Sequence, residues 1–233
     1  MDSQEFPPLE ILFQDEHLVV INKPNGLLVH KSSIATNTST YALQLLRDQL
    51  NQKVYPCHRL DRKTSGILVF ALSKEVQKLV NDQFMNNLTK KNYVAIVRGF
   101  TDASGTIDYE LVNEKGSAKQ AITHYQTLAT TELPIPLGKF ATSRYSLVEV
   151  KPVTGRMHQI RRHFAHIFHP IIGDRPHGCN KQNKLFLERW NFSNLLLHAQ
   201  QLELEHPITH EQLIFEANLP EEFIRMQKEL GLD

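Results

Sequence analysis

Cysteine is scarce in this sequence of 233 residues, which holds only two, Cys57 and Cys179. They lie far apart and outside any CxxC spacing, so neither a disulfide framework nor a zinc site is indicated. We expect both to be reduced thiols with a structural role. The twelve histidines are scattered without HExxH-type spacing, so we also expect no bound metal ion and no other cofactor.

Long apolar runs are absent as well. No window approaches the roughly 18 to 20 apolar residues that a membrane span requires. The first ten residues, MDSQEFPPLE, are acidic and lack the basic start and apolar core of a signal peptide. We therefore expect a cytoplasmic protein that does not bind membranes. With 41% hydrophobic residues a chain of this length can bury a full core, and one domain is the simplest expectation.

An overall excess of positive charge is also lacking, since the formal net charge is only +1. The charges are nevertheless polarised along the chain. Residues 151–163 carry four Lys or Arg and no acid, whereas residues 201–233 carry eight acids against two bases. Clustered cations are the footprint expected on a phosphate-rich ligand, with the acidic segment facing away from it. By itself, such a run more often marks a solvated face.

Hydrophobic periodicity predicts many strands and few helices. Strands are expected at residues 10–14, 17–22, 66–72, 91–98, 105–112, 121–130, 144–151, 195–205 and 212–217. Helices are expected at about 39–50, from the N-cap Ser73 to about Leu88, and from Pro220 to about Leu230. The segment from Gly173 to Leu187, rich in Asn, Lys and Gln, is predicted to be a mobile loop. This mixture favours an α+β sheet over a regular βαβ repeat.

The run HRLDRKTSGILVFA, from His58 to Ala71, places a lone carboxylate, Asp61, among cations immediately before a predicted strand. The apolar residues that follow call for burial, whereas the charged ones cannot all be buried without partners. The polar cluster should therefore lie where a strand meets a cleft. An acid in that position is a candidate catalyst. A surface loop in which Asp61 pairs with Arg59 or Arg62 explains the same residues equally well.

A second candidate side chain is Arg161. If residues 156–167 are helical, Arg161 lies at the edge of an apolar face. That face would consist of Met157, Ile160, Phe164 and Ile167. A partly buried guanidinium needs an anion with two acceptor oxygens, unless Arg161 instead extends along Met157 to solvent. Arg162 and His163 point elsewhere on this helix and are candidates for phosphate contacts.

Four segments resemble, in the same order, the motifs of the RluA family of pseudouridine synthases. They are NKPNG at 22–26, HRLDRKTSG at 58–66, KNYVAIVRG at 91–99 and TGRMHQIRRH at 154–163. The match spans about residues 9 to 218, and four ordered motifs are far more specific than any one. The resemblance implies a mixed, largely antiparallel central sheet flanked by helices, with the active-site cleft between two sub-halves. It also implies a short extension at 1–8 and a single catalytic domain at 9–233, without a separate N-terminal RNA-binding domain.

The resemblance also implies roles for individual residues. Asp61 corresponds to the family's catalytic aspartate, and its carboxylate would be the partner of Arg161. Whether Asp61 attacks the sugar, adds to the base or removes a sugar proton stays open. Tyr93 corresponds to the family tyrosine, whose ring would stack on uracil, although an aromatic residue on a strand can equally belong to the core. Arg161 completes the expected catalytic set.

A uridine within folded RNA is stacked and paired, so the enzyme must flip it into a pocket. The resemblance suggests that Arg59 fills the gap left in the RNA and that His198 lies near the pocket floor. Lys63, Lys90 and Lys91 are candidates for contacts with the RNA backbone. Asn22, Lys23 and Gly26 are expected to shape the cleft. The residues expected to bind the substrate are Arg59, His58, Arg62, Lys63, Lys91, Arg162 and His198.

Three longer segments point to a substrate class. LEILFQDEHLVVINKP, FATSRYSLVEVKPVTGRMHQIRRH and HPIIGDRPHG resemble the single-domain members of the family that modify tRNA at position 65. We therefore expect a tRNA partner and a monomeric enzyme. Relatives with the same four motifs act on ribosomal RNA or on other tRNA positions, so these substrates stay open.

Two other classes of protein are less compatible with the sequence. A glycoside hydrolase would normally need a second carboxylate across the scissile bond, and the motifs offer only Asp61. A catalytically silent RNA-binding module is expected to have lost one of Asp61, Tyr93 and Arg161, and all three are present.

Overall fold

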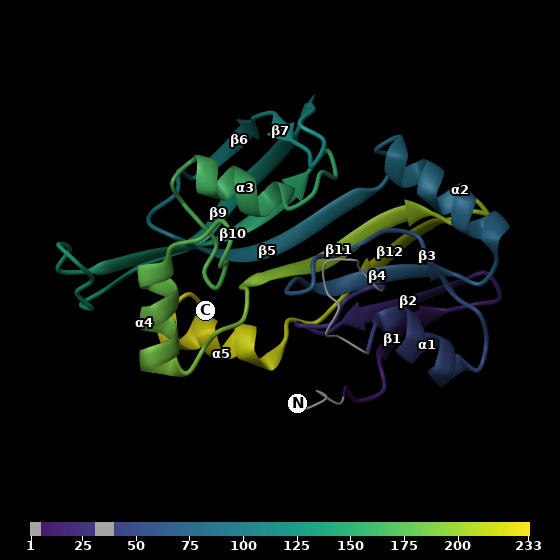
Figure 1. Cartoon of the computed structure of the whole chain (residues 1–233), viewed down its shortest axis with the longest axis horizontal. Helices are drawn as coiled ribbons and strands as arrows, with labels where there is room; N and C mark the ends of the chain where they lie inside the picture. Colours follow the sequence, from purple (N-terminus) through teal and green to yellow (C-terminus); the bar gives the residue numbers. More distant parts are fainter. Residues whose placement is uncertain (1–5, 31–39) are drawn as a thin grey trace. The chain divides into compact units, whose positions relative to one another are not determined.

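The structure is a computed structural model that describes residues 6–30 and 40–233. The chain forms two compact units (Figure 1). Unit 1 consists of the chain up to Lys90 together with Ala199–Asn218, and unit 2 consists of Lys91–His198 together with Leu219–Asp233. Both units combine strands with helices, which confirms the predicted α+β class.

Unit 1 is built on strands in the order β1-β2-β4-β11, with β3 beside β4 and β12 beside β11. The strands are β1 (Glu10–Gln14), β2 (Leu18–Lys23), β3 (Tyr55–Pro56), β4 (Ser65–Ala71), β11 (Leu197–Glu205) and β12 (Gln212–Glu216). The pairings β1–β2, β2–β4, β3–β4 and β11–β12 are antiparallel. Every residue of β4 is buried, as expected for a central strand covered on both faces. The unit's helices are α1 (Ala42–Leu50) and α2 (Lys74–Met85).

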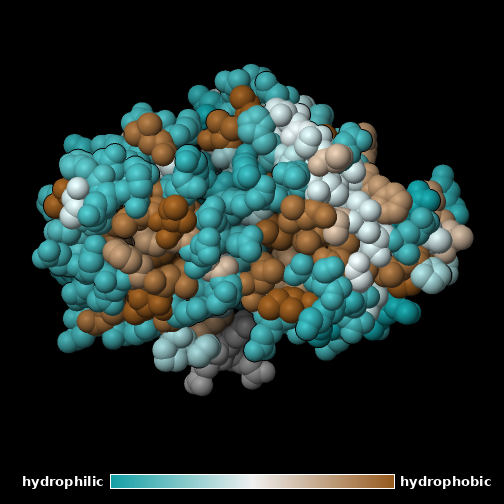
Figure 2. Space-filling view, turned by 180° about the vertical axis from the view of Figure 1, so that it is seen from behind, coloured by the Kyte–Doolittle hydropathy of each residue, from teal (hydrophilic) through white to brown (hydrophobic). Residues whose placement is uncertain are grey.

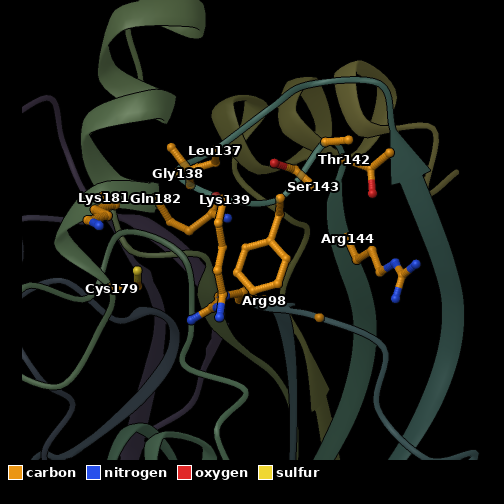
Figure 3. A pocket seen from close by; sticks show the side chains of 13 residues that line it. Arg98, Leu137, Gly138, Lys139, Thr142, Ser143, Arg144, Cys179, Lys181 and Gln182 are labelled. Atoms are coloured by element: carbon orange, nitrogen blue, oxygen red, sulfur yellow. The ribbon is translucent and has the colours of Figure 1, made fainter.

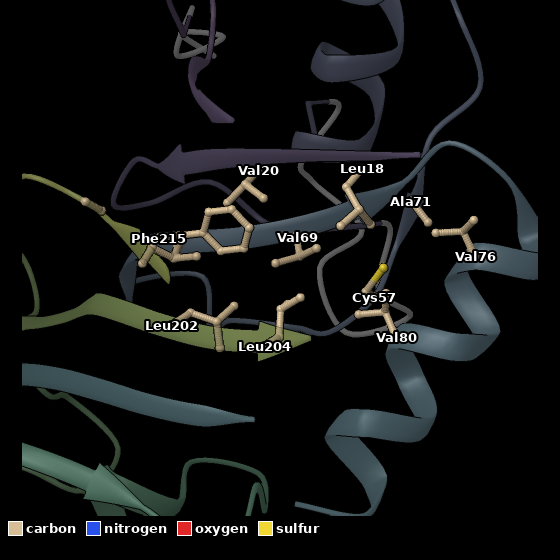
Figure 4. Packing of buried hydrophobic residues seen from close by; sticks show 12 residues of the cluster. Leu18, Val20, Cys57, Val69, Ala71, Val76, Val80, Leu202, Leu204 and Phe215 are labelled. Carbon is tan, nitrogen blue, oxygen red and sulfur yellow. The ribbon is translucent and has the colours of Figure 1, made fainter. Parts of the chain in front are cut away.

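The core of unit 1 lies between this sheet and α2. Figure 4 shows side chains of β2, β4, β11 and β12 converging with Val76 and Val80 of α2. The Oγ of Ser73 accepts a hydrogen bond from the backbone N–H of Val76 at 3.2 Å, which confirms the predicted N-cap. Cys57 belongs to the same core, and its burial raises the pKa of the thiol to about 12. Both cysteines are free, as predicted.

Unit 2 contains the strand order β5-β10-β9-β6, with every neighbouring pair antiparallel. The strands are β5 (Lys90–Arg98), β6 (Ser104–Asp108), β9 (Ile122–Leu133) and β10 (Ser143–Pro152), and β7 (Leu111–Val112) pairs with β8 (Ala118–Lys119) in a separate ribbon. The helices are α3 (Gln159–His166), α4 (Asn180–Trp190) and α5 (Glu221–Leu230). One core cluster joins β5 and β10 to α4 and α5, and another joins the same strands to α3.

Most predicted elements are present, and three differ. The predicted mobile loop at 173–187 is wrong: α4 covers its second half, because Phe186 is fully buried in the core and tertiary packing stabilises a helix that local sequence favours weakly. The single strand expected at 105–112 is two, β6 and β7. The helix expected at 156–167 begins only at Gln159, so Met157, 40% exposed, is not part of its buried face. The start of the helix predicted at 39–50 lies outside the described residues.

On the face shown in Figure 2, hydrophilic residues predominate and apolar patches lie between them. Within residues 6–30 and 40–233, no helix is both long and apolar enough to cross a membrane.

Candidate active site

Asp61 lies in the turn that joins β3 to β4 in unit 1. Its backbone carbonyl accepts the N–H of Thr64 at 3.1 Å, which closes the turn. The neighbours Leu60 and Thr64 are buried, whereas Asp61 itself is half-buried. Because the fully buried strand β4 starts one residue after Thr64, the sheet fixes the position of this carboxylate.

Lys23, which is fully buried, supports the turn through hydrogen bonds. Its ammonium donates hydrogen bonds to the carbonyls of Pro24, Leu27 and Arg62, at 2.9, 2.8 and 3.2 Å. Burial lowers the pKa of Lys23 to about 7, and the charge of Asp61 opposes that shift. In its protonated form, buried Lys23 therefore attracts the Asp61 carboxylate from within the same unit.

The segment around Gly26 is bonded directly to the turn. The N–H of Gly26 donates to the carbonyl of Arg62, and the Nε of Arg62 donates to the carbonyl of Gly26, both at 2.9 Å. The side-chain amide of Asn25 donates to the carbonyl of Lys63. The first motif thus supports the second, and one nitrogen of Arg62 is committed to this support. Substrate contacts by Arg62 and Lys63 stay predictions.

His58 ties the turn to the core. Its Nε2 accepts the backbone N–H of Val69 at 3.1 Å, and its ring stacks on Phe84 with 4.6 Å between the ring centroids. These contacts give His58 a structural function, and its predicted RNA contact stays untested. Arg59, the next residue, is exposed to solvent, as a side chain that inserts into RNA must be.

Close packing between β4 and β11 requires a glycine at position 66, just after the turn. Gly66 has a φ of +109°, and a Cβ at this position would lie 2.2 Å from the carbonyl oxygen of Ala199 on β11. Any other residue would push β4 and β11 apart. The glycine of the TSG sequence is therefore required by the sheet that carries Asp61.

Tyr93 lies on β5 of unit 2, opposite Val150 of β10. It is half-buried and packs against the core cluster that contains Val97 and Phe164. Lys91, two residues earlier on the same face of the strand, has a pKa lowered by burial. The Nζ of Lys90 lies 2.7 Å from the carboxylate of Glu203, so an ion pair competes with the RNA contact expected of Lys90.

Arg161 on α3 forms a buried, two-pronged ion pair that the sequence did not reveal. Its Nε and one terminal nitrogen each donate to a different carboxylate oxygen of Asp174, both at 2.8 Å. The side chains are 9% and 1% exposed. Burial alone would raise the pKa of Asp174, but the hydrogen bonds and charge of Arg161 and the backbone N–H of His177 lower it below its ordinary value.

The position of Asp174 is itself fixed by α4. The side-chain amide of Asn183 donates to the carbonyl of Asp174 at 2.7 Å and accepts the N–H of Gly173 at 3.0 Å. Gly173 has a φ of +83°, and a Cβ there would lie 1.6 Å from the carbonyl oxygen of Asn194. Asp174 occupies the HPIIGDRPHG segment, which sequence reasoning had used for resemblance alone.

The expected pairing of Arg161 with Asp61 stays a prediction. A guanidinium has five N–H donors, and Asp174 accepts two of them. The part of the expectation that concerns Arg161 itself is confirmed: the guanidinium is buried and bound in the bidentate manner.

The rest of the third motif holds α3 in place. Buried Gln159 accepts a hydrogen bond from the Oγ1 of Thr154 at 2.7 Å and donates to the carbonyl of Ile122 at 2.9 Å. The Oγ1 of Thr154 in turn accepts the N–H of Ile122 at 3.0 Å. This network joins the start of α3 to the start of β9. It therefore helps to orient the helix that carries Arg161, independently of the contacts that Arg161 itself makes.

Other predicted cationic contacts are modified by the structure. His163 is wrong as a phosphate ligand, because it is fully buried and its Nε2 lies 3.1 Å from the carbonyl of Tyr109. Arg162 is better exposed and donates to the carbonyl of Val112. Lys151 pairs with Glu149 at 2.7 Å, which weakens the positive run at 151–163. His198 is fully buried on β11.

Among the described residues, no three His, Cys, Asp or Glu side chains are grouped to hold a metal ion.

Comparison with known proteins identifies the family. The family model described as RNA pseudouridylate synthase matches residues 17–166, which contain Asp61, Tyr93 and Arg161. This chain belongs to that family. The predicted family is thus confirmed, and with it the enzyme class: a pseudouridine synthase, an isomerase that acts on RNA.

This pseudouridine synthase has close relatives over nearly its whole length. It is 47% identical over 222 residues to tRNA pseudouridine synthase C of Vibrio parahaemolyticus, which covers 91% of this chain and 90% of that protein. It is 46% identical to the Vibrio cholerae protein of the same name, over 96% of each chain. Among solved structures, human RNA pseudouridylate synthase domain containing 4 aligns with a TM-score of 0.74 and 28% identity, covering 95% and 93% of the two chains. The last similarity confirms the predicted pseudouridine synthase fold.

Proposed function

We propose that this pseudouridine synthase converts a uridine of tRNA to pseudouridine, at position 65. The observation that carries the substrate class is the identity of 46–47%, over nine-tenths of the chain or more, to proteins named tRNA pseudouridine synthase C. Position 65 comes from the resemblance of the segments that include HPIIGDRPHG. The expected site of action is the cytoplasm, and the expected active form is a monomer comprising a single catalytic domain over 9–233.

The reaction breaks the N1–C1′ bond of uridine, turns the detached uracil and joins its C5 to C1′. A proton leaves C5 and a proton is gained at N1, so the isomerisation is redox-neutral. Asp61 is proposed as the catalytic carboxylate. As a nucleophile it would stabilise the sugar or base as a covalent adduct, and as a base it would remove a sugar proton; both roles require a fixed, ionised carboxylate.

The structure of unit 1 supports that role for Asp61. The turn is closed by the Thr64 N–H and linked to the Gly26 segment, and buried Lys23, when protonated, attracts the carboxylate. Such preorganisation reduces the motion needed to reach the transition state. In unit 2, the half-buried ring of Tyr93 is proposed to stack on uracil, and Arg161, held by Asp174, to provide positive charge.

RNA binding would use exposed cations and a flipped nucleotide. Extracting a base from a tRNA arm costs roughly a few kcal/mol, and exposed Arg59 is proposed to fill the space it leaves. Lys63, Lys91 and Arg162 are proposed backbone contacts, with His58, Arg62 and His198 in supporting positions. Structured RNA is recognised largely by shape, so arm geometry should matter as much as sequence.

The test incubates the purified enzyme with unmodified tRNA and, separately, with a ribosomal RNA fragment, and maps pseudouridine by base-specific chemistry. One modified uridine at tRNA position 65 is the expected result, and tRNA with cytidine at that position should remain unmodified. Modification of the ribosomal fragment but not of tRNA would overturn the substrate assignment while leaving the reaction class intact.

A further inference from the structure

Unit 2 contains a pocket of about 810 Å³ at the end of β5 farthest from Tyr93. Three segments line it: the end of β5, the 137–144 connection into β10, and the first residues of α4 with the preceding Cys179 (Figure 3). Arg98, which lines the pocket, follows Tyr93 by five residues on an extended strand, a separation of about 17 Å at about 3.3 Å per residue. The pocket is therefore remote from the part of β5 that carries the family tyrosine.

The lining of this pocket is cationic. Four of its side chains are basic, namely Arg98, Lys139, Arg144 and Lys181, and none of the thirteen lining residues is acidic. The carboxylate of Glu132, outside the lining, lies 3.1 Å from Arg144. Within the described part of the chain, the other three form no ion pair with an acid. A concave surface with this charge is complementary to phosphate groups.

Aromatic rings lie beside these cations. Phe140 in the lining is 55% exposed, and the ammonium of Lys139 lies 5.5 Å from its ring centroid. Phe100, which follows the lining residue Gly99, is 43% exposed, and the guanidinium carbon of Arg144 lies 5.0 Å from its centroid. Exposed rings interleaved with cations form the kind of platform on which unpaired bases stack.

The pocket also has a buried polar group. Gln182 is 4% exposed, lines the pocket, and accepts a hydrogen bond from the hydroxyl of Tyr145 at 2.8 Å through its Oε1. Its Nε2 makes no hydrogen bond to the described residues, so its N–H donors are available for a ligand. Donors fixed by a buried partner suit the acceptor oxygens of a nucleotide.

We propose that this pocket is a second RNA-binding site, which takes a nucleotide of the RNA substrate other than the reacting uridine. A base of that nucleotide stacks on Phe140, and its phosphates contact Lys139, Lys181 and Arg98. The volume lies within the range of pockets that enclose a nucleotide-sized ligand. The inference rests on the proposed function, because it takes RNA to be the substrate.

The test uses the double variant Lys139→Gln/Lys181→Gln and the single variant Phe140→Ala in the full chain. The matched control is Lys184→Gln/Lys228→Gln, which removes the same charge from exposed positions of α4 and α5 outside the pocket. We expect the pocket double variant to bind tRNA about tenfold more weakly than the control at about 0.1 M salt, with a salt slope reduced by roughly one to two. KM should rise, and kcat at saturating tRNA should stay within about twofold of wild type.

Two further arms separate the possible outcomes. A short stem-loop that contains only the target arm should be modified equally by wild type and by Phe140→Ala, because it does not reach the pocket. The variant Lys139→Arg/Lys181→Arg should restore tRNA binding.

If RNA is modified normally but the Gln double variant binds tRNA as the control does, the pocket proposal is overturned and the proposed function stands. If a mononucleotide binds the pocket at micromolar concentration without competing with tRNA, the site serves a small molecule instead. Absence of any RNA modification by wild type would overturn the proposed function itself.

Discussion

Arg161 and Asp174 are joined by two hydrogen bonds of 2.8 Å between side chains that are almost completely buried. They are thirteen positions apart in the sequence, and each is anchored independently. The helix of Arg161 is fixed by Gln159, and the backbone of Asp174 is fixed by Asn183. The pair therefore presents the Arg161 guanidinium in one orientation, as a group that stabilises a reacting anion requires.

Replacing Asp174 with asparagine tests this arrangement. Asp174→Asn keeps the shape but removes the charge, leaving a buried guanidinium without its counter-ion, a change that typically costs about 3–5 kcal/mol of stability. At a temperature where the variant is folded, we expect kcat to fall at least tenfold with little change in the tRNA Kd. Asp102→Asn, an exposed carboxylate of the same unit, is the control and should leave both values unchanged. Unaltered kcat in folded Asp174→Asn would show that the pair only stabilises the fold.

The buried Lys23 predicts an unusual pH dependence of stability. Its pKa is about 7 in the folded chain and returns to 10.5 on unfolding. Between these values the unfolded chain binds one more proton, so the free energy of unfolding rises with pH. Between pH 7 and 9 the rise due to Lys23 should reach up to about 2 kcal/mol, since each unit of pKa difference corresponds to about 1.4 kcal/mol.

Urea denaturation of wild type and of Lys23→Met at pH 7, 8 and 9 measures that contribution. The free energy of unfolding of wild type minus that of Lys23→Met should increase with pH. The free energy of unfolding of Lys78→Met, a substitution on the exposed face of α2, should change with pH as that of wild type does. Parallel curves for wild type and Lys23→Met would mean that Lys23 remains charged throughout this range.

Asp61→Asn tests the proposed catalytic residue. The substitution removes the charge and preserves the size of the side chain, so we expect a folded protein that binds tRNA normally and forms no detectable pseudouridine, a loss of at least about a thousandfold in rate. The exposed Asp48→Asn in the same unit should retain full activity. Pseudouridine is quantified by mass spectrometry of digested tRNA, and turnover near the wild-type rate would remove Asp61 from the mechanism.

Chelation provides a separate test of the chemistry. Because the proposed isomerisation is redox-neutral and uses Asp61, we expect millimolar EDTA to leave the initial rate within about 20% of the untreated value, with tRNA refolded in monovalent salt beforehand. Inhibition by EDTA that added zinc reverses would contradict this mechanism.

Local sequence was sufficient for much of this protein. Several features depend only on residues that are near one another in the chain. They are the alternation and apolar runs of β1, β2 and β5, the N-cap Ser73 and the four ordered motifs. Such features depend on backbone preferences and on local side-chain chemistry, so they can be read without knowing what packs against them. The proposal that Asp61 is the catalytic residue likewise comes from the motif that surrounds it.

Tertiary structure decided the contacts that give these residues their environment. Spacing indicated that Arg161 needs an anion but not that Asp174 supplies one, and it did not reveal that His163 is buried or that Lys23 supports the Asp61 turn. The helix α4 forms because Phe186 is buried in the core of unit 2, and the cationic pocket gathers three segments that are distant in sequence. The free energy of burying a charge or an aromatic ring depends on which neighbours the whole fold brings to it, and those neighbours lie tens of residues away along the chain.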